Sequence, residues 1–235
     1  MEEKVKCLKR STKLSQILEL GSIIDLSYPL GERTPIYPGS IGFSISDRSN
    51  IERDGKKTSK IILNTHIGTH IDAPAHLFLK AQTIDRIPLK KMMGKALILK
   101  LKKEGFQKDV YGLKDLDEET EYINQVDILI IKVGNSKTAM SRERLFSKYP
   151  VPDSSVLKWI INHKIKCLGT DAISIDKTNS KTMENHKLLL GKKILLIEGL
   201  FNLEKIDCDI FYFMAIPINI KNGDGAPCRA FSIMI

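Results

Sequence analysis

Short apolar stretches, most of them about as long as a β-strand, recur along this chain. Two stretches, residues 41–47 and 59–64, alternate apolar and polar positions, as strands with one solvated face do. The others are nearly uninterrupted apolar runs, which are typical of strands inside a sheet. These runs are residues 95–101, 127–133, 167–170, 193–197, 211–216 and 230–235. The pattern predicts a sheet of many short strands.

Helical signals are fewer. Residues 153–163 predict a helix, with Asp153 in the N-cap position directly after a proline. Residues 12–20 predict a short amphipathic helix that ends at Gly21. The turn-forming residues of 30–40 predict an ordered loop. We therefore expect a mixed α/β domain, richer in strand than in helix and built around one core.

The composition suits one globular domain. The chain has 235 residues, of which 42% are hydrophobic and 28% are charged, and it shows no internal repeat or long linker. No apolar run approaches the roughly 18–20 residues that a membrane span requires. The N-terminal residues are charged and lack the apolar region of a secretory signal. We therefore expect a cytoplasmic protein without a membrane partner.

The formal net charge of +9 raises the question of nucleic-acid binding. Nucleic-acid-binding proteins usually gather lysine and arginine into a stripe, whereas the lysines here are spread along the chain in ones and twos. Aromatic residues, which stack on single-stranded bases, make up only 6%. We attribute the charge to a solvated surface and expect no nucleic-acid partner. The four cysteines form no C-x-x-C pair, which favours packed, reduced thiols over a zinc knuckle.

Three of the five histidines fall in the segment HIGTHIDAPAH, residues 66–76. A helical zinc site of the H-E-x-x-H kind is excluded, because no Glu follows the first histidine and the segment contains a glycine and a proline. On an extended or turning backbone, alternate residues from His70 to His76 share one face, and the Gly-Thr turn brings His66 beside them. Imidazoles and the carboxylate of Asp72 would then form a first shell for a divalent transition metal.

A single buried histidine is more often a hydrogen-bonded core residue than a ligand. Three of them beside an aspartate in an apolar context would leave several buried polar groups unsatisfied without a shared ion, so the ligand interpretation is favoured. A second pair supports it. Glu198 follows the apolar run 193–197, where a carboxylate is costly unless it is paired or metal-bound. His186 begins a short helical turn ended by Gly191, and a helix-turn-strand of this length returns both side chains to one edge of the sheet.

The segment 66–76 resembles, at every fixed position, the H-x-G-T-H-x-D-x-P-x-H signature of the cyclase family, which includes bacterial kynurenine formamidases and isatin hydrolases. The resemblance extends over DLS at 25–27, YPG at 37–39, GTDAISID at 169–176, EGLFNL at 198–203 and the ending from Pro217 to Arg229. Only residues 1–20 lie outside it. The resemblance implies an N-terminal extension at 1–20 and a catalytic domain at 21–235 with the swivelling β/β/α fold of the family.

The resemblance also implies a divalent-metal centre. His66 and His70 match the ligands of a first metal, and His186 matches a ligand of a second. Asp72 and Glu198 match residues that bridge the two metals. The kynurenine formamidases of the family resemble a two-zinc design, whereas some relatives use one manganese. Two zinc ions are therefore expected, with a single manganese as the alternative.

Further roles follow from the same resemblance. His76 matches the family's proton donor and acceptor. Tyr37 stands where bacterial kynurenine formamidases carry a tryptophan against the substrate's aromatic ring, and a tyrosine can still stack on an aryl group. A homodimer or a higher homo-oligomer, with the Tyr37 loop near a neighbouring subunit's pocket, is expected from the resemblance alone. His163, at the end of the predicted helix, is expected to lie outside the site.

These residues supply what hydrolysis of an amide bond in a small molecule needs. The resemblance implies an enzyme such as the arylformamidase that converts N-formylkynurenine to kynurenine and formate. A metal activates water and polarises the carbonyl, and a histidine that titrates near neutrality protonates the departing amine. Acyl-enzyme chemistry is disfavoured, because the chain has no G-x-S-x-G elbow. Hydrolysis of a cyclic amide or a lactone would use the same residues. A third alternative is a metal-binding protein without catalysis, in which His76 completes a closed shell.

Overall fold

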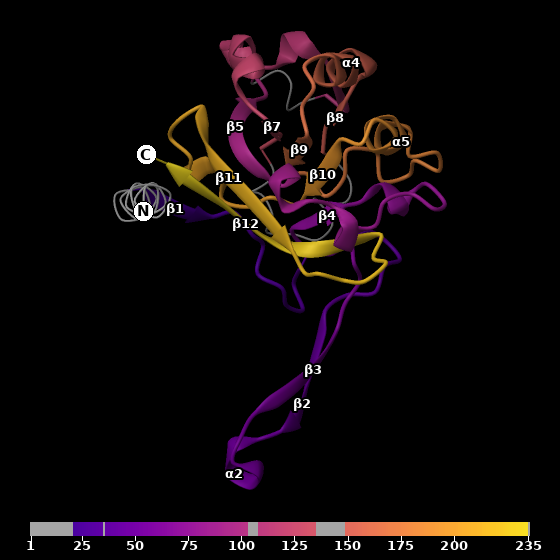
Figure 1. Ribbon diagram of the computed structural model, residues 1–235, viewed down its shortest axis with the longest axis vertical. Helices are drawn as coiled ribbons and strands as arrows, with labels where there is room; N and C mark the ends of the chain where they lie inside the picture. The colour runs from indigo at the N-terminus through magenta and orange to yellow at the C-terminus, as the bar shows by residue number, and fades with distance from the viewer. Residues whose placement is uncertain (1–20, 35, 103–107, 135–148, 235) are drawn as a thin grey trace, which may run out of the picture.

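The computed structural model describes residues 21–34, 36–102, 108–134 and 149–234 (Figure 1). The helix predicted at residues 12–20 lies outside the described residues, so the division into an N-terminal extension and a catalytic domain stays a prediction. In the part of the chain that is described, no helix is both long and apolar enough to cross a bilayer.

One eight-stranded sheet organises the described residues. Its strands are β1 (Ser22–Asp25), β4 (His70–Asp72), β5 (Met93–Lys100), β7 (Ile128–Lys132), β9 (Cys167–Thr170), β10 (Leu195–Glu198), β11 (Ile210–Pro217) and β12 (Gly225–Met234). They follow the order β1-β12-β11-β5-β7-β9-β10-β4, and the first residues of β12 also pair with β4. This last pairing closes the sheet into a barrel, and β1 is attached at the far end of β12.

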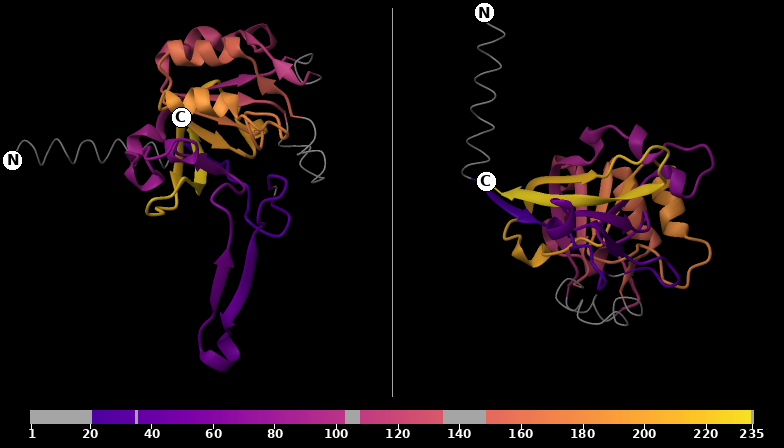
Figure 2. Two further views of the ribbon diagram at one scale, coloured as in Figure 1. Left: turned by 90° about the vertical axis from the view of Figure 1, so that its right-hand side faces the viewer. Right: turned by 90° about the horizontal axis from the view of Figure 1, so that it is seen from below.

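Burial on both faces explains the uninterrupted apolar runs. β5, β7, β9 and β10 run parallel, and parallel strands are usually covered on both sides. In β5, Leu97 and Leu99 belong to one core cluster, whereas Ala96 and Ile98 belong to another. The first cluster packs under α4 (Ser154–Asn162) and α5 (Glu184–Gly191), which lie next to each other (Figures 1 and 2). The second cluster draws on the barrel strands and fills the barrel.

Most predicted elements are confirmed. Asp153 is the N-cap of α4, and its carboxylate accepts hydrogen bonds from the backbone N–H groups of Ser155 and Val156 at 2.8 and 3.1 Å. β9 has the predicted bounds, and the described residues of the loop at 30–40 contain neither helix nor strand. The strand-rich mixed α/β domain is therefore as expected, although the strand predicted at 193–197 begins at Leu195 and takes in Glu198.

Short elements fill the connections. A small parallel pair is formed by β6 (Val110–Tyr111) and β8 (Val151–Pro152). The 3-10 helices η2 (Ile84–Arg86), η3 (Leu89–Lys91), η5 (Leu113–Asp115), η6 (Glu118–Gln125) and η8 (Leu203–Lys205) lie between the strands.

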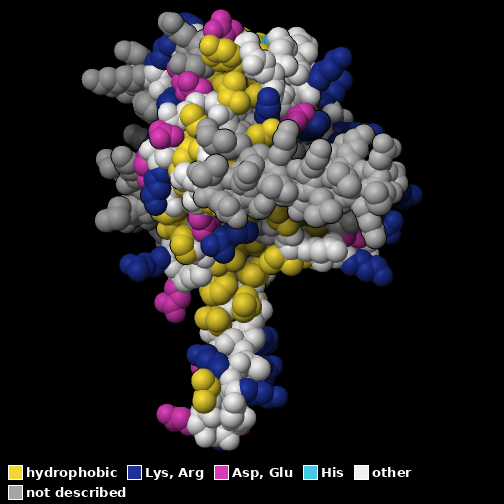
Figure 3. Space-filling view, turned by 60° about the vertical axis from the view of Figure 1, so that its left-hand side comes forward, with side chains coloured by type: hydrophobic (Ala, Val, Ile, Leu, Met, Phe, Trp, Pro, Cys, Tyr) yellow, Lys and Arg dark blue, Asp and Glu magenta, His cyan; other side chains and the backbone are white. Residues whose placement is uncertain are grey.

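One hairpin projects from the body. It consists of β2 (Ser44–Ser49), the single helical turn α2 (Ile51–Asp54) and β3 (Thr58–Ile62), and Figures 1 and 2 show it standing away from the barrel. Its strands, predicted at 41–47 and 59–64, are present, but almost all of their residues are exposed. Hydrophobic side chains lie along it together with lysines and arginines (Figure 3).

The extended conformation expected from His70 to His76 holds only for β4. Pro74 opens a 3-10 helix, η1 (Pro74–His76), so the strand alternation ends at Asp72 and that part of the prediction is wrong. Proline suits the first position of a helical turn, because its missing N–H has no partner there anyway. His76 therefore reaches the site through a turn.

Candidate metal centre

Two glycines bring the histidine-rich segment against the end of β10. Gly68 and Gly199 both have a left-handed backbone, with φ of 59° and 67°. A Cβ on Gly199 would overlap the Gly68 carbonyl group, so only glycine fits. The Thr69 hydroxyl donates a hydrogen bond to the Gly199 carbonyl at 2.6 Å, which holds the two glycine segments together. As a result, Glu198 pairs across the sheet with His70.

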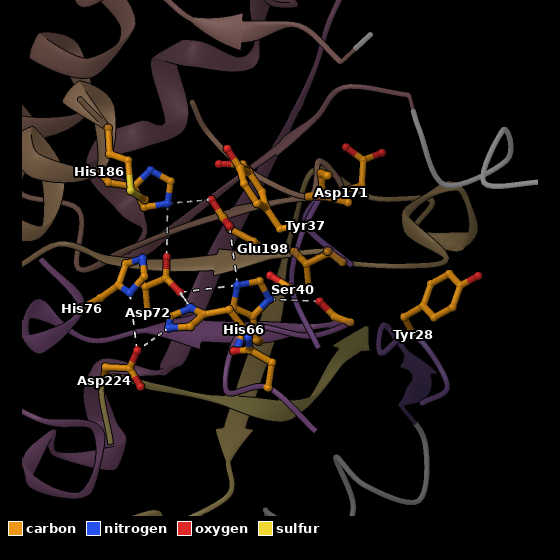
Figure 4. A pocket seen from close by; sticks show the side chains of 18 of the residues that line it. Tyr28, Tyr37, Ser40, His66, Asp72, His76, Asp171, His186, Glu198 and Asp224 are labelled. Atoms are coloured by element: carbon orange, nitrogen blue, oxygen red, sulfur yellow. Dashed lines mark hydrogen bonds and ion pairs between the residues drawn. The ribbon is translucent and has the colours of Figure 1, made fainter. Parts of the chain in front are cut away.

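Two carboxylates lie between the pair His66 and His70 on one side and the single ring of His186 on the other (Figure 4). Asp72 Oδ1 lies 2.7 Å from His66 Nδ1 and 3.4 Å from His70 Nε2. Glu198 Oε2 lies 3.5 Å from His70 Nε2. The remaining oxygens, Asp72 Oδ2 and Glu198 Oε1, lie 3.3 and 3.2 Å from His186 Nε2. Each carboxylate thus presents one oxygen to each side.

The histidines of this centre direct their other ring nitrogens to acceptors outside it. The contacts are His66 Nε2 to Asp224 Oδ2 at 2.8 Å, His70 Nδ1 to the Gly68 carbonyl at 3.0 Å, and His186 Nδ1 to Asp176 Oδ2 at 2.7 Å. Metal-ligating histidines typically donate their second N–H in this way, which fixes the ring and leaves the first nitrogen for the ion.

His66 and His186 face carboxylate oxygens with both ring nitrogens, which a neutral imidazole with one N–H cannot serve. Burial opposes protonation of both rings, but the carboxylates outweigh it. Asp224 and Asp72 raise the pKa of His66 to about 10. Glu198, first among the carboxylates around His186, helps to raise the pKa of that ring to about 12. In the metal-free protein, the protons on these two imidazoles therefore lie between nitrogen and carboxylate oxygen, where a metal cation could bind instead.

One buried oxygen also lacks a hydrogen bond. Asp72 Oδ2 has no hydrogen-bond partner among the described residues, although His186 Nε2 lies 3.3 Å away. Burial would raise the pKa of Asp72, but His186 and His66 hold it well below its usual range, so the carboxylate is charged. This oxygen therefore has an ion pair with His186 but no hydrogen bond, which leaves part of its capacity as an acceptor unused. A divalent cation would satisfy it, and imidazole nitrogens with carboxylate oxygens are donors that zinc and manganese accept.

His76 lies beside this donor set. Its Nδ1 is 3.6 Å from Asp224 Oδ2, and its ring is tilted against that of His66 with centroids 4.0 Å apart. The ring of His186 is 6.1 Å away. Burial, together with repulsion from His66 and His186, lowers the pKa of His76, so the neutral ring prevails near pH 7.

The centre opens into a cavity of about 540 Å³, a size that suits a small-molecule ligand. Tyr28, Tyr37, Ile173 and Phe201 contribute apolar and aromatic surface to its lining. Tyr28 and Phe201 are in edge-to-face contact at 5.1 Å. The Tyr37 hydroxyl donates to the Thr178 carbonyl, which holds this ring against the loop before α5.

The residues predicted from the sequence meet at this one place. The structure brings together His66, His70, Asp72, His186 and Glu198. His76 borders them, and Tyr37 lines the same cavity. His163 follows α4 as its C-cap residue, with Nδ1 2.8 Å from the Trp159 carbonyl, and is absent from the cavity lining.

Two carboxylates of the site were not predicted as functional residues. Asp224 lies between two glycines just before β12, and Asp176 ends the segment GTDAISID. Both fall in stretches that carry the family resemblance, which is the only signal for them. Their type and spacing do not reveal that Asp224 faces His66 or that Asp176 faces His186, because these contacts depend on the folded chain.

Comparisons with known proteins agree on one family. The model of the Cyclase family matches residues 24–177. An uncharacterized protein of Methanocaldococcus jannaschii is 34% identical over 84% of this chain and 92% of its own length. The kynurenine formamidase of Geobacillus thermodenitrificans is 29% identical over 88% of this chain and 95% of its own length.

Among solved structures, an isatin hydrolase bound to the product analogue thioisatinate superposes with a TM-score of 0.81. It is 19% identical to this chain and covers 100% of it, and the chain covers 99% of that structure, so the two share a fold. The family model spans more than half of the chain, and the H-x-G-T-H-x-D-x-P-x-H segment lies within the matched residues. The protein described here belongs to the cyclase family.

Proposed function

We propose that this protein is a metal-dependent hydrolase of small-molecule amides, with an N-formyl arylamine as the preferred class of substrate. The observation that carries the proposal is how the two carboxylate oxygens of Asp72, and likewise those of Glu198, are divided between the two sides of the centre. Each directs one oxygen to the His66–His70 side and the other to His186, at 2.7–3.5 Å. Carboxylates that serve two groups of imidazoles in this way suit a centre of two metals, for which zinc is the first candidate and a single manganese the alternative.

The ligands would be His66 and His70 on one side, His186 on the other, and Asp72 and Glu198 between them. These residues would hold a divalent cation, whose chemistry there would be the activation of water near neutral pH and the polarisation of a carbonyl oxygen. They would hold it in a fixed geometry, because all of these side chains except that of His66 are buried.

His76 is proposed as the acid–base residue. It lines the cavity beside the ligands, and its lowered pKa keeps it neutral and able to accept a proton near pH 7. In amide hydrolysis the carbonyl carbon gains an oxygen and its bond to nitrogen breaks. The departing amine needs a proton, and a histidine that has just accepted one can supply it.

The lining of the cavity supports an aromatic substrate. Tyr28, Tyr37 and Phe201 offer rings on which an aryl group can stack. The kynurenine formamidases among the relatives make N-formylkynurenine the first substrate to test. A cyclic amide or a lactone is the second candidate, because an isatin hydrolase shares the fold and a fused ring fits the same volume.

The proposal is tested with purified protein of known metal content on a formylanilide, a cyclic imide and a lactone. We expect hydrolysis of the formylanilide at the highest kcat/KM. Preference for the imide or the lactone would select the second candidate. Bound metal without turnover of any of the three would favour a metal-binding protein whose shell His76 closes, and spectroscopy of the metal would then show no open, water-filled position.

The assembly is also part of the proposal. We propose a homodimer in which the projecting β2–β3 hairpin packs against a second copy, because a lone two-stranded hairpin is marginally stable in water. Ile45 and Ile61 are cross-strand partners on the hairpin, and these residues are 56% and 53% exposed. The cytoplasmic location and the lack of nucleic-acid and membrane partners stay predictions.

A further inference from the structure

Asp224 is fixed to the segment that carries the catalytic histidine. Its carbonyl accepts a hydrogen bond from the backbone N–H of Ala73 at 2.9 Å, and the carbonyl of Gly223 accepts one from Ile84 at 2.9 Å. Gly225, the next residue, packs so closely on His66 that a Cβ there would lie 2.7 Å from the ring. The turn therefore holds the Asp224 carboxylate at a set position over the histidines.

One oxygen of this carboxylate faces two imidazoles. Asp224 Oδ2 accepts a hydrogen bond from His66 Nε2 at 2.8 Å and lies 3.6 Å from His76 Nδ1 (Figure 4). The two rings are themselves in contact, with centroids 4.0 Å apart. His66 belongs to the proposed ligand set and His76 does not, so Asp224 connects a ligand with the proposed acid–base residue.

We propose that Asp224 is a positioning residue that holds His66 and His76 in a fixed arrangement at the mouth of the metal centre. The inference rests on the proposed function for His76 and on the donor geometry for His66. It gives a role to Asp224, which lies outside the proposed ligand set.

The effect on His66 follows from its two nitrogens. Nδ1 points to Asp72 and Nε2 points to Asp224. When Asp224 accepts the Nε2 proton, the lone pair of the neutral ring is on Nδ1, the atom that faces the donor set. A carboxylate in this position also makes the ligand nitrogen a stronger donor.

The effect on His76 concerns its tautomer. An anionic oxygen near Nδ1 favours the neutral ring that carries its proton on Nδ1, which leaves the Nε2 lone pair to accept a proton from the reacting groups. At 3.6 Å the contact is longer than a hydrogen bond. Hydrogen bonds between catalytic groups are often long without substrate and shorten when substrate binds. Asp224 lies close enough to His76 to form a hydrogen bond in this way.

The first test measures metal affinity and needs no substrate. Asp224→Ala and Asp224→Asn are titrated against a chromophoric chelator with zinc. We expect Asp224→Ala to bind one zinc about 10–100-fold more weakly than the wild type, the usual effect of removing such a partner. Asp224→Asn should lose less, because its amide oxygen still accepts the Nε2 proton. Asp209→Asn is the matched control, since its side chain is 43% exposed against 44% for Asp224.

The second test is a double-mutant cycle at saturating zinc. Asp224→Ala should lower kcat about 10–100-fold with little change in KM. In the His76→Ala background, the same change should cost much less, because its action through His76 is already gone. Additive losses in the cycle would show that Asp224 does not act through His76 and would overturn that half of the inference.

The two tests separate this inference from the proposed function. Wild-type affinity for zinc in Asp224→Ala would overturn the role at His66, even if the enzyme hydrolyses amides as proposed. Conversely, if the wild type binds zinc but hydrolyses no amide, the proposed function fails, and weaker binding by Asp224→Ala still supports the role at His66.

Discussion

At the scale of single residues, the proposed ligands differ from the proposed proton carrier in what each imidazole faces. His70 and His186 each lie within 3.5 Å of oxygens of both Asp72 and Glu198. The ion pair of His76, in contrast, is with Asp224. Buried carboxylates that converge on an imidazole favour a cation there, whereas a ring at the border is free to exchange protons with substrate.

Replacement of His76 tests this separation. His76→Ala should keep the wild-type metal content but lose about 10²–10⁴-fold in kcat, the usual contribution of general acid–base catalysis. The loss should be larger for an anilide than for an ester with a good leaving group, because only the nitrogen of the anilide must be protonated to depart. Metal analysis and initial rates on both substrates provide the measurement. An empty metal site, or equal loss on both substrates, would make His76 a ligand or a positioning residue.

His163→Ala is the matched histidine control. The ring of His163 packs against Trp159 with centroids 5.1 Å apart and caps α4, so it does not take part in the site. We expect metal content and rate within about twofold of the wild type, with at most a small loss of stability from the weakened helix end. A loss of metal by folded His163→Ala protein would mean that the ligand set is wrong.

The sequence was most informative where type and spacing together carry the signal. Three histidines and an aspartate in one short apolar segment are rare without a shared ion, and this pattern located most of the centre. Asp176 and Asp224 carry no such signal. Aspartates before a helix or in a glycine turn are common for local reasons, and their contacts with His186 and His66 arise from the tertiary fold.

At the scale of elements, α5 has an unusual beginning that matters for the site. Its N-cap position is occupied by Met183, which has a left-handed backbone and provides no side-chain cap. Asp176 supplies the missing acceptors from the preceding loop, since its carboxylate accepts from the backbone N–H groups of Asn185 and His186, each at 3.1 Å. The same carboxylate holds His186 Nδ1. One side chain therefore fixes both the helix and the ring that it carries.

Asp176→Ala should therefore have two effects. Loss of the helix-end acceptors is expected to lower the free energy of unfolding of the metal-free protein by about 1–2 kcal/mol. Loss of the contact with His186 should weaken the binding of one metal about 10–100-fold. Urea unfolding and chelator competition give the two quantities.

Asp153→Ala is the control, because Asp153 caps α4 with a similar geometry and contacts no histidine of the site. It should lower stability by a similar amount and leave metal affinity unchanged. If both variants weaken metal binding equally, the loss reflects general destabilisation and the specific role of Asp176 is refuted.

Strands could be predicted from the sequence where consecutive residues are buried on both faces of the sheet. β7 and β9 are covered on both faces, so their apolar runs stand out in the sequence. β1 is short and mostly exposed, and β4 is interrupted after three residues by Pro74, so neither has the length or pattern of an obvious strand. Closure of the barrel depends on the pairing of β12 with β4, more than a hundred residues apart, and local patterns do not encode it.

At the scale of the whole molecule, the metal centre joins parts of the fold that are distant along the chain. Its residues come from the segment before β4, from β4 itself, and from α5 and β10, and its outer carboxylate Asp224 precedes β12. Without a cation, the buried carboxylates of the centre raise the pKa of the histidines that they face. A bound ion that stabilises only the folded state should therefore stabilise the molecule as a whole.

Metal removal should thus lower both activity and thermal stability. An ion at 100 times its Kd contributes about 2.7 kcal/mol, which corresponds to a fall in Tm of about 5–10 °C for a domain of this size on chelation. Calorimetry of chelated protein, before and after addition of zinc or manganese, measures the shift, and amide hydrolysis is followed in the same samples. Full turnover or an unchanged Tm in protein verified to be metal-free would contradict the metal-dependent function.

The hairpin gives the last prediction, which concerns the assembly. β2 and β3 pair only with each other, and their apolar residues have no cover within the described chain. Exposed apolar side chains on a projecting ribbon are typical of a surface that another chain covers. In a two-fold dimer the hairpins of the two copies would pack against each other, so a single interface would bury the apolar residues of both hairpins.

Ile45→Lys and Ile61→Lys should therefore convert the dimer into a monomer of 26.5 kDa without unfolding the barrel. Each places a charge on the face where these two side chains oppose each other, and burying an unpaired charge is far more costly than leaving it in water. Leu89→Lys is the control, because Leu89 lies on the body and is 55% exposed, close to the 56% of Ile45. Light scattering at micromolar concentration gives the mass of each variant. A wild type of 26.5 kDa would reject the dimer, and a dimer that survives both hairpin substitutions would place its interface elsewhere on the molecule.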